Sequence, residues 1–267
     1  MPPAGSASYY ALQRCAPDVR ASVAALIEYH VQVRDIADAV GDPQVAQAKL
    51  SWWAGQVDAL RTARADHPVL RALGPRLAAA GAAPDALTGV VDSVRIDLAQ
   101  NRWLDRAALL HYCERSCGQT LRASAALLGL RDAAALDAAQ DLGVGLRQVA
   151  IVRNLGRDIG RGRIYVPLDA MRRHGVTAAS LHRRAVDASI RALLADEARL
   201  ARARLDAARA ALARYPTAQT APLLAIGAMA QALLTEIERE EFAVLHQRIG
   251  LTPLRKLWIS RSCTWRR

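Results

Sequence analysis

The chain has 267 residues, long enough to bury a sizeable core, and 52% of them are hydrophobic while only 4% are aromatic. Its formal net charge is +11, and arginine carries nearly all of the positive charge, because lysine occurs only at positions 49 and 256. No helix-turn-helix, zinc-finger or RNP-type motif accompanies this charge, which makes nucleic acid an unlikely partner. An anionic ligand such as acidic lipid or a diphosphate would explain the charge, and so would arginine-rich, solvated helix faces.

The first predicted elements are helices that begin at prolines. Residues 1–16 are expected to be a short, partly ordered lead-in, after which Pro17 and Asp18 start a helix that breaks at residues 41–43. A second helix is expected over residues 43–65, with one of Trp52 and Trp53 buried and the other at the surface. Two further helices are expected to open at prolines 68 and 84.

The second half of the chain also predicts helices only. Asp105 is a good N-cap for a helix that ends at Gly129, and a further helix should run from near Arg131 to about Gly160. An Ala/Arg-rich helix is expected over 177–214, followed by a last long helix over 218–248. β-branched runs and long linkers are scarce, so the sequence predicts one all-α domain over residues 1–267.

The last long helix contains the run LLAIGAMAQALL, which is apolar on nearly all sides. Such a helix is usually buried in a large bundle, although it could also lie on a bilayer. No apolar run reaches about 18 residues, so no helix is expected to span a membrane. With no signal peptide evident, we expect a cytoplasmic protein that is able to bind the inner face of a membrane peripherally.

The four cysteines do not form the framework of a disulfide-rich protein in a chain of this length. Cys113 and Cys117 share a helix face, and His111 is nearby, which would suit a metal. Structural zinc needs four ligands, and no second pair of ligands follows. Buried free thiols are therefore expected.

Two polar pairs have the spacing of one helical turn. Arg34 and Asp38 are four residues apart, as are Asn154 and Asp158, so each pair shares a helix face. If the bundle brings the two faces together, they form a site.

Several segments resemble the squalene/phytoene synthase family, and in particular the bacterial squalene synthases of hopanoid pathways. They occur in the family's order and cover nearly the whole chain: SASYY, VRDIADAVGDPQVAQAKLSWWAG, DLAQNRWLDRAALLHYCERSCGQ, AIVRNLGRDIGRGRIYVPLDAMRRHGV and PLRKLWI. The resemblance implies an isoprenoid (terpenoid) synthase bundle around a central apolar cavity. It also implies head-to-head joining of two prenyl diphosphates, as in farnesyl diphosphate farnesyltransferase or phytoene synthase, with Mg²⁺ holding the diphosphates.

The resemblance further implies the residues of the site. Tyr112, Asp38 and Asp158 would be catalytic, and Asp35, Asp38 and Asp158 would hold the metal. The residues that would bind substrate occupy the positions of the family's site, although four of them (Arg34, Arg147, Asn154 and Arg157) depart from it: Arg34, Asp35, Arg147, Arg153, Asn154, Arg157, Arg163 and Tyr165. Arg163 and Tyr165 would also fix the turn that closes the site, and Asp97 and Gln100 would line the pocket mouth.

The sequence departs from the family at both metal motifs. The first motif is approximately Asp-Asp-x-x-Asp-Glu, and this chain has Arg34, Asp35, Asp38 and Ala39 at the matching positions. The second is approximately Arg-Asp-x-x-Glu-Asp, and the chain has Arg153, Asn154, Arg157 and Asp158. Three nearby positions also differ from the family's Arg, Gln and Asn, and here they are Val31, Arg147 and Ala150.

These departures change the charge of the site. Leaving Arg153 aside, three aspartates face two arginines across the two motifs, a net charge of −1, whereas a family member carries about seven acids. Guanidinium groups near a cation site repel Mg²⁺, so a three-magnesium cluster is not expected. Two hypotheses follow. In one, Arg34, Arg147 and Arg157 bind a prenyl diphosphate directly, with Mg²⁺-dependent catalysis altered or lost. In the other, the chain is a non-catalytic binding or assembly protein, or the partner of an active paralogue.

Overall fold

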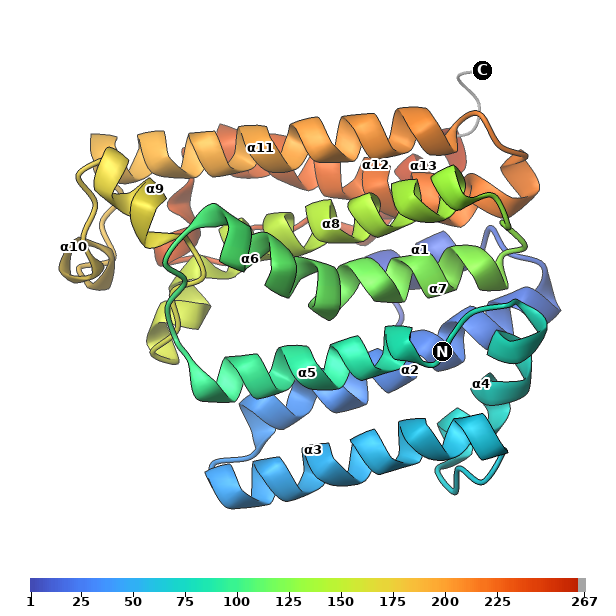
Figure 1. The fold of residues 1–267 in the computed structure, drawn as a ribbon. Coiled ribbons are helices and arrows are strands. Elements are labelled where there is room, and N and C mark those ends of the chain that lie inside the picture. The colour runs from blue at the N-terminus through green and yellow to red at the C-terminus, as the bar shows by residue number, and fades with distance from the viewer. Residues whose placement is uncertain (264–267) are drawn as a thin grey trace.

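A computed structural model describes residues 1–263 of the chain, which fold into an all-α bundle (Figure 1). In chain order its helices are α1 Ala7–Leu12, α2 Pro17–Ala39, α3 Pro43–Asp58, α4 Pro68–Ala79, α5 Asp85–Ala99, α6 Arg106–Cys113, α7 Gln119–Leu127, α8 Ala133–Gly160, α9 Leu168–Arg173, α10 Ala178–His182, α11 Ala188–Leu212, α12 Thr217–Arg239 and α13 Pro253–Ser262. Within these residues the structure has no strand, and a single isolated bridge joins Arg102 to Ile164. The predicted fold class is confirmed.

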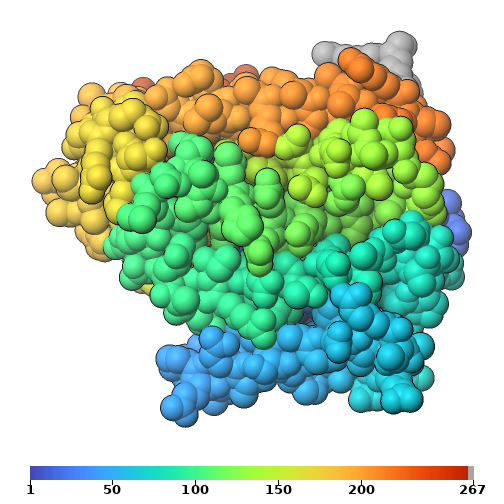
Figure 2. Space-filling model, viewed as in Figure 1, coloured from blue at the N-terminus to red at the C-terminus, as the bar shows by residue number. Residues whose placement is uncertain are grey.

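The bundle is layered. Helices α11 and α8 pack side by side over much of their length, and α12 lies against both (Figure 1). On the other side of α7, helices α2, α4 and α5 surround a second cluster of buried side chains. Helix α3 packs on α2 and α5 and forms a ridge at one edge of the molecule, which Figure 2 shows clearly.

The predicted helix starts are largely those of the structure. Pro17, Pro43 and Pro68 each occupy a first-turn position, and the Asp105 carboxylate caps α6 by accepting a hydrogen bond from Ala108. The tryptophan pair also behaves as expected, because Trp53 is 6% exposed and Trp52 is 49% exposed.

Several boundaries differ from the predictions. The lead-in is ordered: it contains α1, which packs on α12 and α13, and the Ser260 hydroxyl donates to the Tyr10 carbonyl. The helix predicted over 177–214 is divided, because Arg184 adopts a positive φ of 55° and Asp187 then caps α11 anew. The helix predicted over 218–248 ends at Arg239, since Glu241 and Phe242 also take positive φ values. The helix predicted over 43–65 ends as α3 at Asp58 and continues as a short 3₁₀ turn.

Helix α12 is the core helix that its sequence predicts. Among the described residues it is the one helix that is long and apolar enough, by length and composition alone, to cross a membrane. However, 67% of its apolar stretch is buried inside the bundle. A core helix of a large bundle has the same properties.

The helix predicted between Asp105 and Gly129 contains a π-helical segment, Glu114–Gly118, between α6 and α7. Here α8 approaches backbone to backbone, because a Cβ added at Gly143 would lie 2.6 Å from the Cys117 carbonyl oxygen. Single π-helical turns are frequent at functional sites, and this one carries Cys117 to the wall of the cavity described below.

A second close approach holds the segment that follows α12. A Cβ added at Gly156 of α8 would lie 2.4 Å from the Leu245 carbonyl oxygen. We expect Gly156→Ala to lower the free energy of unfolding by about 1–3 kcal/mol, because backbone atoms on both sides must separate. Gly55→Ala on α3 is the matched control: nothing lies within 4 Å of its added Cβ, so this change should be neutral or slightly stabilising. Urea denaturation of both variants measures the difference, and equal stabilities would contradict the prediction.

Candidate functional site

The bundle encloses a central cavity of about 780 Å³, as the fold class predicts. Its walls come from α1, α2, α7, α8 and α12, and residues 248–256 close one end. Most of the lining is aliphatic, including Val23, Ile27, Leu121, Leu128, Val149, Leu223, Ile226, Met229 and Leu233. A volume in this range is typical of small-molecule sites, and this lining suits a long apolar chain.

Three cations line the same cavity: Arg153 of α8, Arg248 of the segment between α12 and α13, and Lys256 of α13. In the part of the chain that the structure describes, none of them forms an ion pair with a carboxylate. The Arg153 Nε donates to the Asn154 amide oxygen at 3.0 Å, and the Lys256 Nζ donates to the Gly5 carbonyl at 2.8 Å. The protein therefore holds three positive charges around an apolar cavity without internal neutralisation.

The pKa values of two of these cations are lowered, which shows that the arrangement disfavours their charged forms. Burial, and then the nearby charges of Arg248 and Arg157, lower the pKa of Arg153 to about 10. Burial, and then Arg153 and Arg248, also lower the pKa of Lys256. A bound anion would relieve this mutual repulsion. The cluster is thus suited to an anionic group attached to an apolar chain.

His30 of α2 also lines the cavity and shares a hydrogen bond of 3.1 Å with the Thr120 hydroxyl. Burial, and then Arg34 and Arg147, lower its pKa to about 3, so the imidazole is neutral in the folded protein. Since His30 in the unfolded chain gains a proton at about pH 6.5, the folded state should lose stability as the pH falls from there towards 3.

This pH dependence can be measured. We expect His30→Gln, which cannot titrate, to remove about 2 kcal/mol of the stability loss between pH 7 and about pH 4.5. Urea denaturation of wild type and variant at both pH values gives the comparison. Identical losses in both proteins would show that His30 does not carry the effect.

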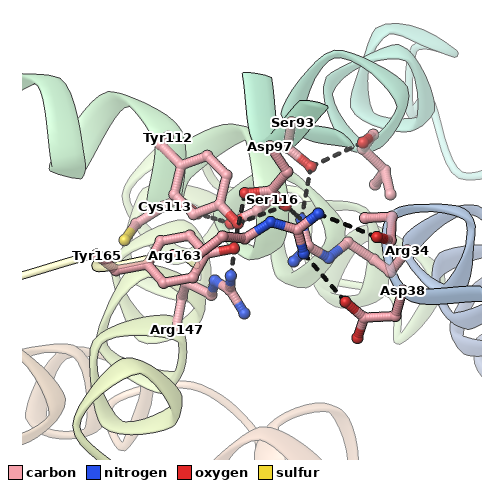
Figure 3. Close-up of polar contacts among 12 residues, drawn as sticks. Arg34, Asp38, Ser93, Asp97, Tyr112, Cys113, Ser116, Arg147, Arg163 and Tyr165 are labelled. Atoms are coloured by element: carbon pink, nitrogen blue, oxygen red, sulfur yellow. Dashed lines mark hydrogen bonds and ion pairs between the residues drawn. The ribbon is translucent and has the colours of Figure 1, made fainter. Parts of the chain in front are cut away.

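A buried polar cluster lies beside the cavity and is centred on Asp97 of α5, which is 4% exposed (Figure 3). The Asp97 carboxylate accepts hydrogen bonds from the Arg34 guanidinium at 2.8 Å, the Tyr112 hydroxyl at 3.0 Å and the Tyr165 hydroxyl at 2.8 Å. One carboxylate thus ties α2, α6 and the segment after α8 to α5. Asp97 was expected at the pocket mouth, but it lies in the interior, and Gln100 is exposed at the end of α5.

Arg147 of α8 completes the cluster from the opposite side. It donates to the Tyr112 hydroxyl at 2.5 Å, and its guanidinium lies 5.1 and 5.0 Å from the ring centroids of Tyr112 and Tyr165. These are cation–π distances. Its Nε atom is buried without a hydrogen-bond partner. Because Arg34 and Arg147 face a single carboxylate, the cluster has a net charge of +1.

Burial raises the pKa of Tyr112, although Arg147 and Arg34 oppose the shift. The phenol therefore stays protonated, with its hydroxyl between Asp97 and Arg147. Tyr112, which sequence reasoning named as catalytic, is placed by this network close to two guanidinium groups.

The predicted metal ligands lie elsewhere, and two of the three are already paired with arginines. Asp38 accepts from Arg161 at 2.5 Å and from Arg163 at 3.1 Å. Asp158 accepts from its neighbour Arg157 at 2.9 Å, and Asp35 is exposed. Burial raises the pKa of Asp158, although Arg157 opposes the shift. The ion pairs of Arg161 and Arg163 with Asp38 bring the turn after α8 to the end of α2.

These residues do not fit a magnesium cluster. Among the described residues no three His, Cys, Asp or Glu side chains are grouped so that they could hold a metal ion. Mg²⁺ prefers unpaired carboxylates that leave room for water and substrate phosphate, whereas guanidinium groups occupy both Asp38 and Asp158. The Cys113 and Cys117 thiols are free, and burial raises their pKa values to about 12 and about 11.

The two arginines that replace family residues in the metal motifs behave differently. The Arg34 side chain is 17% exposed and points into the bundle, where it binds Asp97 (Figure 3). The Arg157 side chain is 48% exposed and lies along α8 against Asp158, so it does not reach the interior. Arg163 also donates to the Ala37 carbonyl, and this ties the turn after α8 to the end of α2.

Sequence reasoning missed three of the residues that line the cavity: His30, Arg248 and Lys256. Lys256 could have been noticed, because it is one of two lysines in an arginine-rich chain and lies in the segment PLRKLWI. Arg248 and His30 carry no such signal, since only the packing of distant segments brings them to one cavity.

The comparisons with known proteins agree on one family. A sequence model of the family described as "Squalene/phytoene synthase" matches residues 1–255. A presqualene diphosphate synthase of Sinorhizobium fredii is 27% identical over 187 residues, which cover 70% of this chain and 67% of that protein. A mouse protein named NADH dehydrogenase (ubiquinone) complex I, assembly factor 6 is 24% identical over 251 residues, which cover 92% of this chain and 74% of that protein.

Solved structures show the same fold. A dehydrosqualene synthase in complex with a ligand superposes with a TM-score of 0.89 at 20% identity, covering 97% of this chain and 90% of that one. A squalene synthase from Alicyclobacillus acidocaldarius has a TM-score of 0.72 at 18% identity, covering 87% of this chain and 98% of the other.

Proposed function

The chain belongs to the squalene/phytoene synthase family, and we propose that it binds a prenyl diphosphate, with the prenyl chain in the central cavity and the diphosphate at Arg153, Arg248 and Lys256. One observation carries this proposal: three cations without carboxylate partners among the described residues line a largely apolar cavity. Charged hydrogen bonds from guanidinium and ammonium groups to phosphate are strong, and the apolar walls supply the rest of the affinity.

Mg²⁺-dependent catalysis is proposed to be altered or lost. Members of this family generally use Mg²⁺, whereas two of the three acids at the matching positions here, Asp38 and Asp158, are bound by arginines. The positive charge that a metal would supply is instead provided by arginine and lysine side chains. If the chain retains the family's head-to-head prenyl transfer, the resemblance gives Tyr112 a role in it; Asp97 and Arg147 hold its hydroxyl in the cluster beside the cavity.

A second function is supported by the comparisons. The alignment with the complex I assembly factor covers more of this chain than the alignment with the presqualene diphosphate synthase, 92% against 70%. A non-catalytic role as an assembly protein, or as the partner of an active paralogue, would retain the bundle and the cavity without turnover.

Calorimetry tests the binding proposal. Farnesyl diphosphate, farnesol and inorganic diphosphate are titrated into the protein, once in EDTA and once in Mg²⁺. We expect farnesyl diphosphate to bind in EDTA, and to bind more tightly than either fragment, because only it engages both the cations and the apolar walls. Binding that requires Mg²⁺ would contradict the proposed metal-free site.

A turnover assay distinguishes prenyl transfer from the non-catalytic role. The protein is incubated with farnesyl and geranylgeranyl diphosphates, with and without Mg²⁺, and released diphosphate and hydrocarbon products are measured. Tight binding without product in either condition favours the non-catalytic role. Metal-dependent product formation at ordinary enzymatic rates would show that the paired acids of this chain still support the family's chemistry.

A further inference from the structure

Helix α13 presents a strongly apolar outer face. Leu254 is 80% exposed and Trp258 is 65% exposed, and they are the two most exposed large hydrophobic side chains on the helices of the described residues. They are four residues apart and therefore on the same side of the helix, and the exposed Arg261 follows one turn later. In contrast, Ile259 and Ser260 are buried against the bundle.

The surroundings of this face are positively charged. From residue 242 to the end of the sequence there are six arginines or lysines and no Asp or Glu. Arg255 on the flank of the helix is bound to Glu236 of α12, while Arg261 has no ion pair among the described residues. An amphipathic helix with Leu and Trp on one side and basic residues beside them is typical of peptides that lie in the interface of an anionic membrane.

The same helix forms part of the cavity wall. Lys256, between Leu254 and Trp258 in the sequence, directs its side chain to the cavity, which Arg248, Gly250 and Leu251 also line. Val31 of α2, which is 42% exposed, lines the cavity too, so its wall reaches the molecular surface. The apolar face and the cavity are thus carried by opposite sides of one short helix.

We propose that α13 docks the protein on an anionic membrane surface, with Leu254 and Trp258 inserted among the lipid headgroups and Arg261 facing the lipid phosphates. Trp is suited to this position, because its ring is apolar and its N–H can remain in contact with water. A second copy of the chain is a less suitable partner for this face of α13, since a two-fold dimer would place two basic faces against each other. Docking would bring the cavity, which lies on the other side of α13, close to the bilayer.

Vesicle co-sedimentation tests the proposal on the full chain. Wild-type protein is mixed with vesicles of phosphatidylcholine alone and with vesicles that also contain phosphatidylglycerol. We expect binding to the anionic vesicles, and Leu254→Ala with Trp258→Ala should weaken it about tenfold or more, because two exposed apolar side chains are lost. Arg261→Glu should weaken it about fivefold or more, and only on anionic vesicles.

The matched control removes the same two side-chain types elsewhere. Leu104→Ala with Trp52→Ala deletes an exposed Leu and a half-exposed Trp that lie outside α13, and this variant should bind vesicles as the wild type does. The proposal is overturned if wild-type protein binds neither vesicle type, or if the α13 variant and the control bind the anionic vesicles equally well. It is also overturned if sedimentation velocity shows a dimer that the α13 variant abolishes while vesicle binding is absent. Farnesyl diphosphate affinity in solution is measured in parallel, so that failure of the cavity proposal can be recognised separately.

Discussion

Asp97→Ala is expected to lower the free energy of unfolding by about 3–5 kcal/mol, the range found when one partner of a buried ion pair is removed. The Asp97 carboxylate accepts from Arg34, Tyr112 and Tyr165 and is 4% exposed. Without it, the guanidinium groups of Arg34 and Arg147 remain in the interior with no negative charge in the cluster. Urea or thermal denaturation measures the loss.

Asp92→Ala is the control on the same helix. Asp92 forms ion pairs with Arg95 and Arg115, but its side chain is 28% exposed and water can replace it. We expect a change of about 1 kcal/mol or less. If the two alanine variants were equally stable, the cluster around Asp97 would contribute no more than a surface ion pair.

The double variant Arg153→Ala with Lys256→Ala is expected to weaken farnesyl diphosphate binding about 100-fold or more. A hydrogen bond to a charged group contributes about 1.5–3 kcal/mol, and two such groups are removed. The same variant should be at least as stable as the wild type without ligand, because the pKa values of both groups are lowered by burial and by other cations. Calorimetry and thermal denaturation on one sample distinguish loss of the site from loss of the fold.

The matched control is Arg157→Ala with Arg255→Ala, one substitution on each of the same two helices. Both arginines are bound to acids and neither lines the cavity. The control should bind farnesyl diphosphate as the wild type does. A comparable loss of affinity in the control would mean that net positive charge, and not the three cavity cations, attracts the ligand.

These two predictions separate the two basic clusters of the protein. Arg34 and Arg147 are held by Asp97 and by two aromatic rings, so they have defined orientations and stabilise the bundle. Arg153, Arg248 and Lys256 have no such partners, and their charges repel one another around the cavity. Charges that destabilise the free protein are typical of a site whose ligand supplies the missing counter-charge.

Much of the fold follows from local sequence signals. Proline at first-turn positions and aspartate caps act within one turn of the residue concerned, and so Pro17, Pro43, Pro68 and Asp105 mark helix starts correctly. The sequence analysis was wrong to predict one continuous helix over 177–214 and to extend the last long helix to residue 248. In the structure the first is divided at Arg184, and α12 ends before Phe242. The residues at these breaks, Arg184, Glu241 and Phe242, are neither Gly nor Pro, so the sequence carries no local signal for the positive φ values that end the helices.

The features of the site also fall into two groups, those that the sequence determines and those that only the tertiary structure determines. By itself the sequence determined the all-α class, the family and the departures at Arg34, Ala39, Asn154 and Arg157, since these depend on residue types in a known order. Only the tertiary structure decided that Arg34 turns inward to Asp97 while Arg157 stays at the surface beside Asp158. It also decided that Arg153, Arg248 and Lys256 line one cavity. The physical reason is that burial, charge repulsion and hydrogen bonding depend on distances between residues up to about 100 positions apart, which the spacing along one helix does not determine.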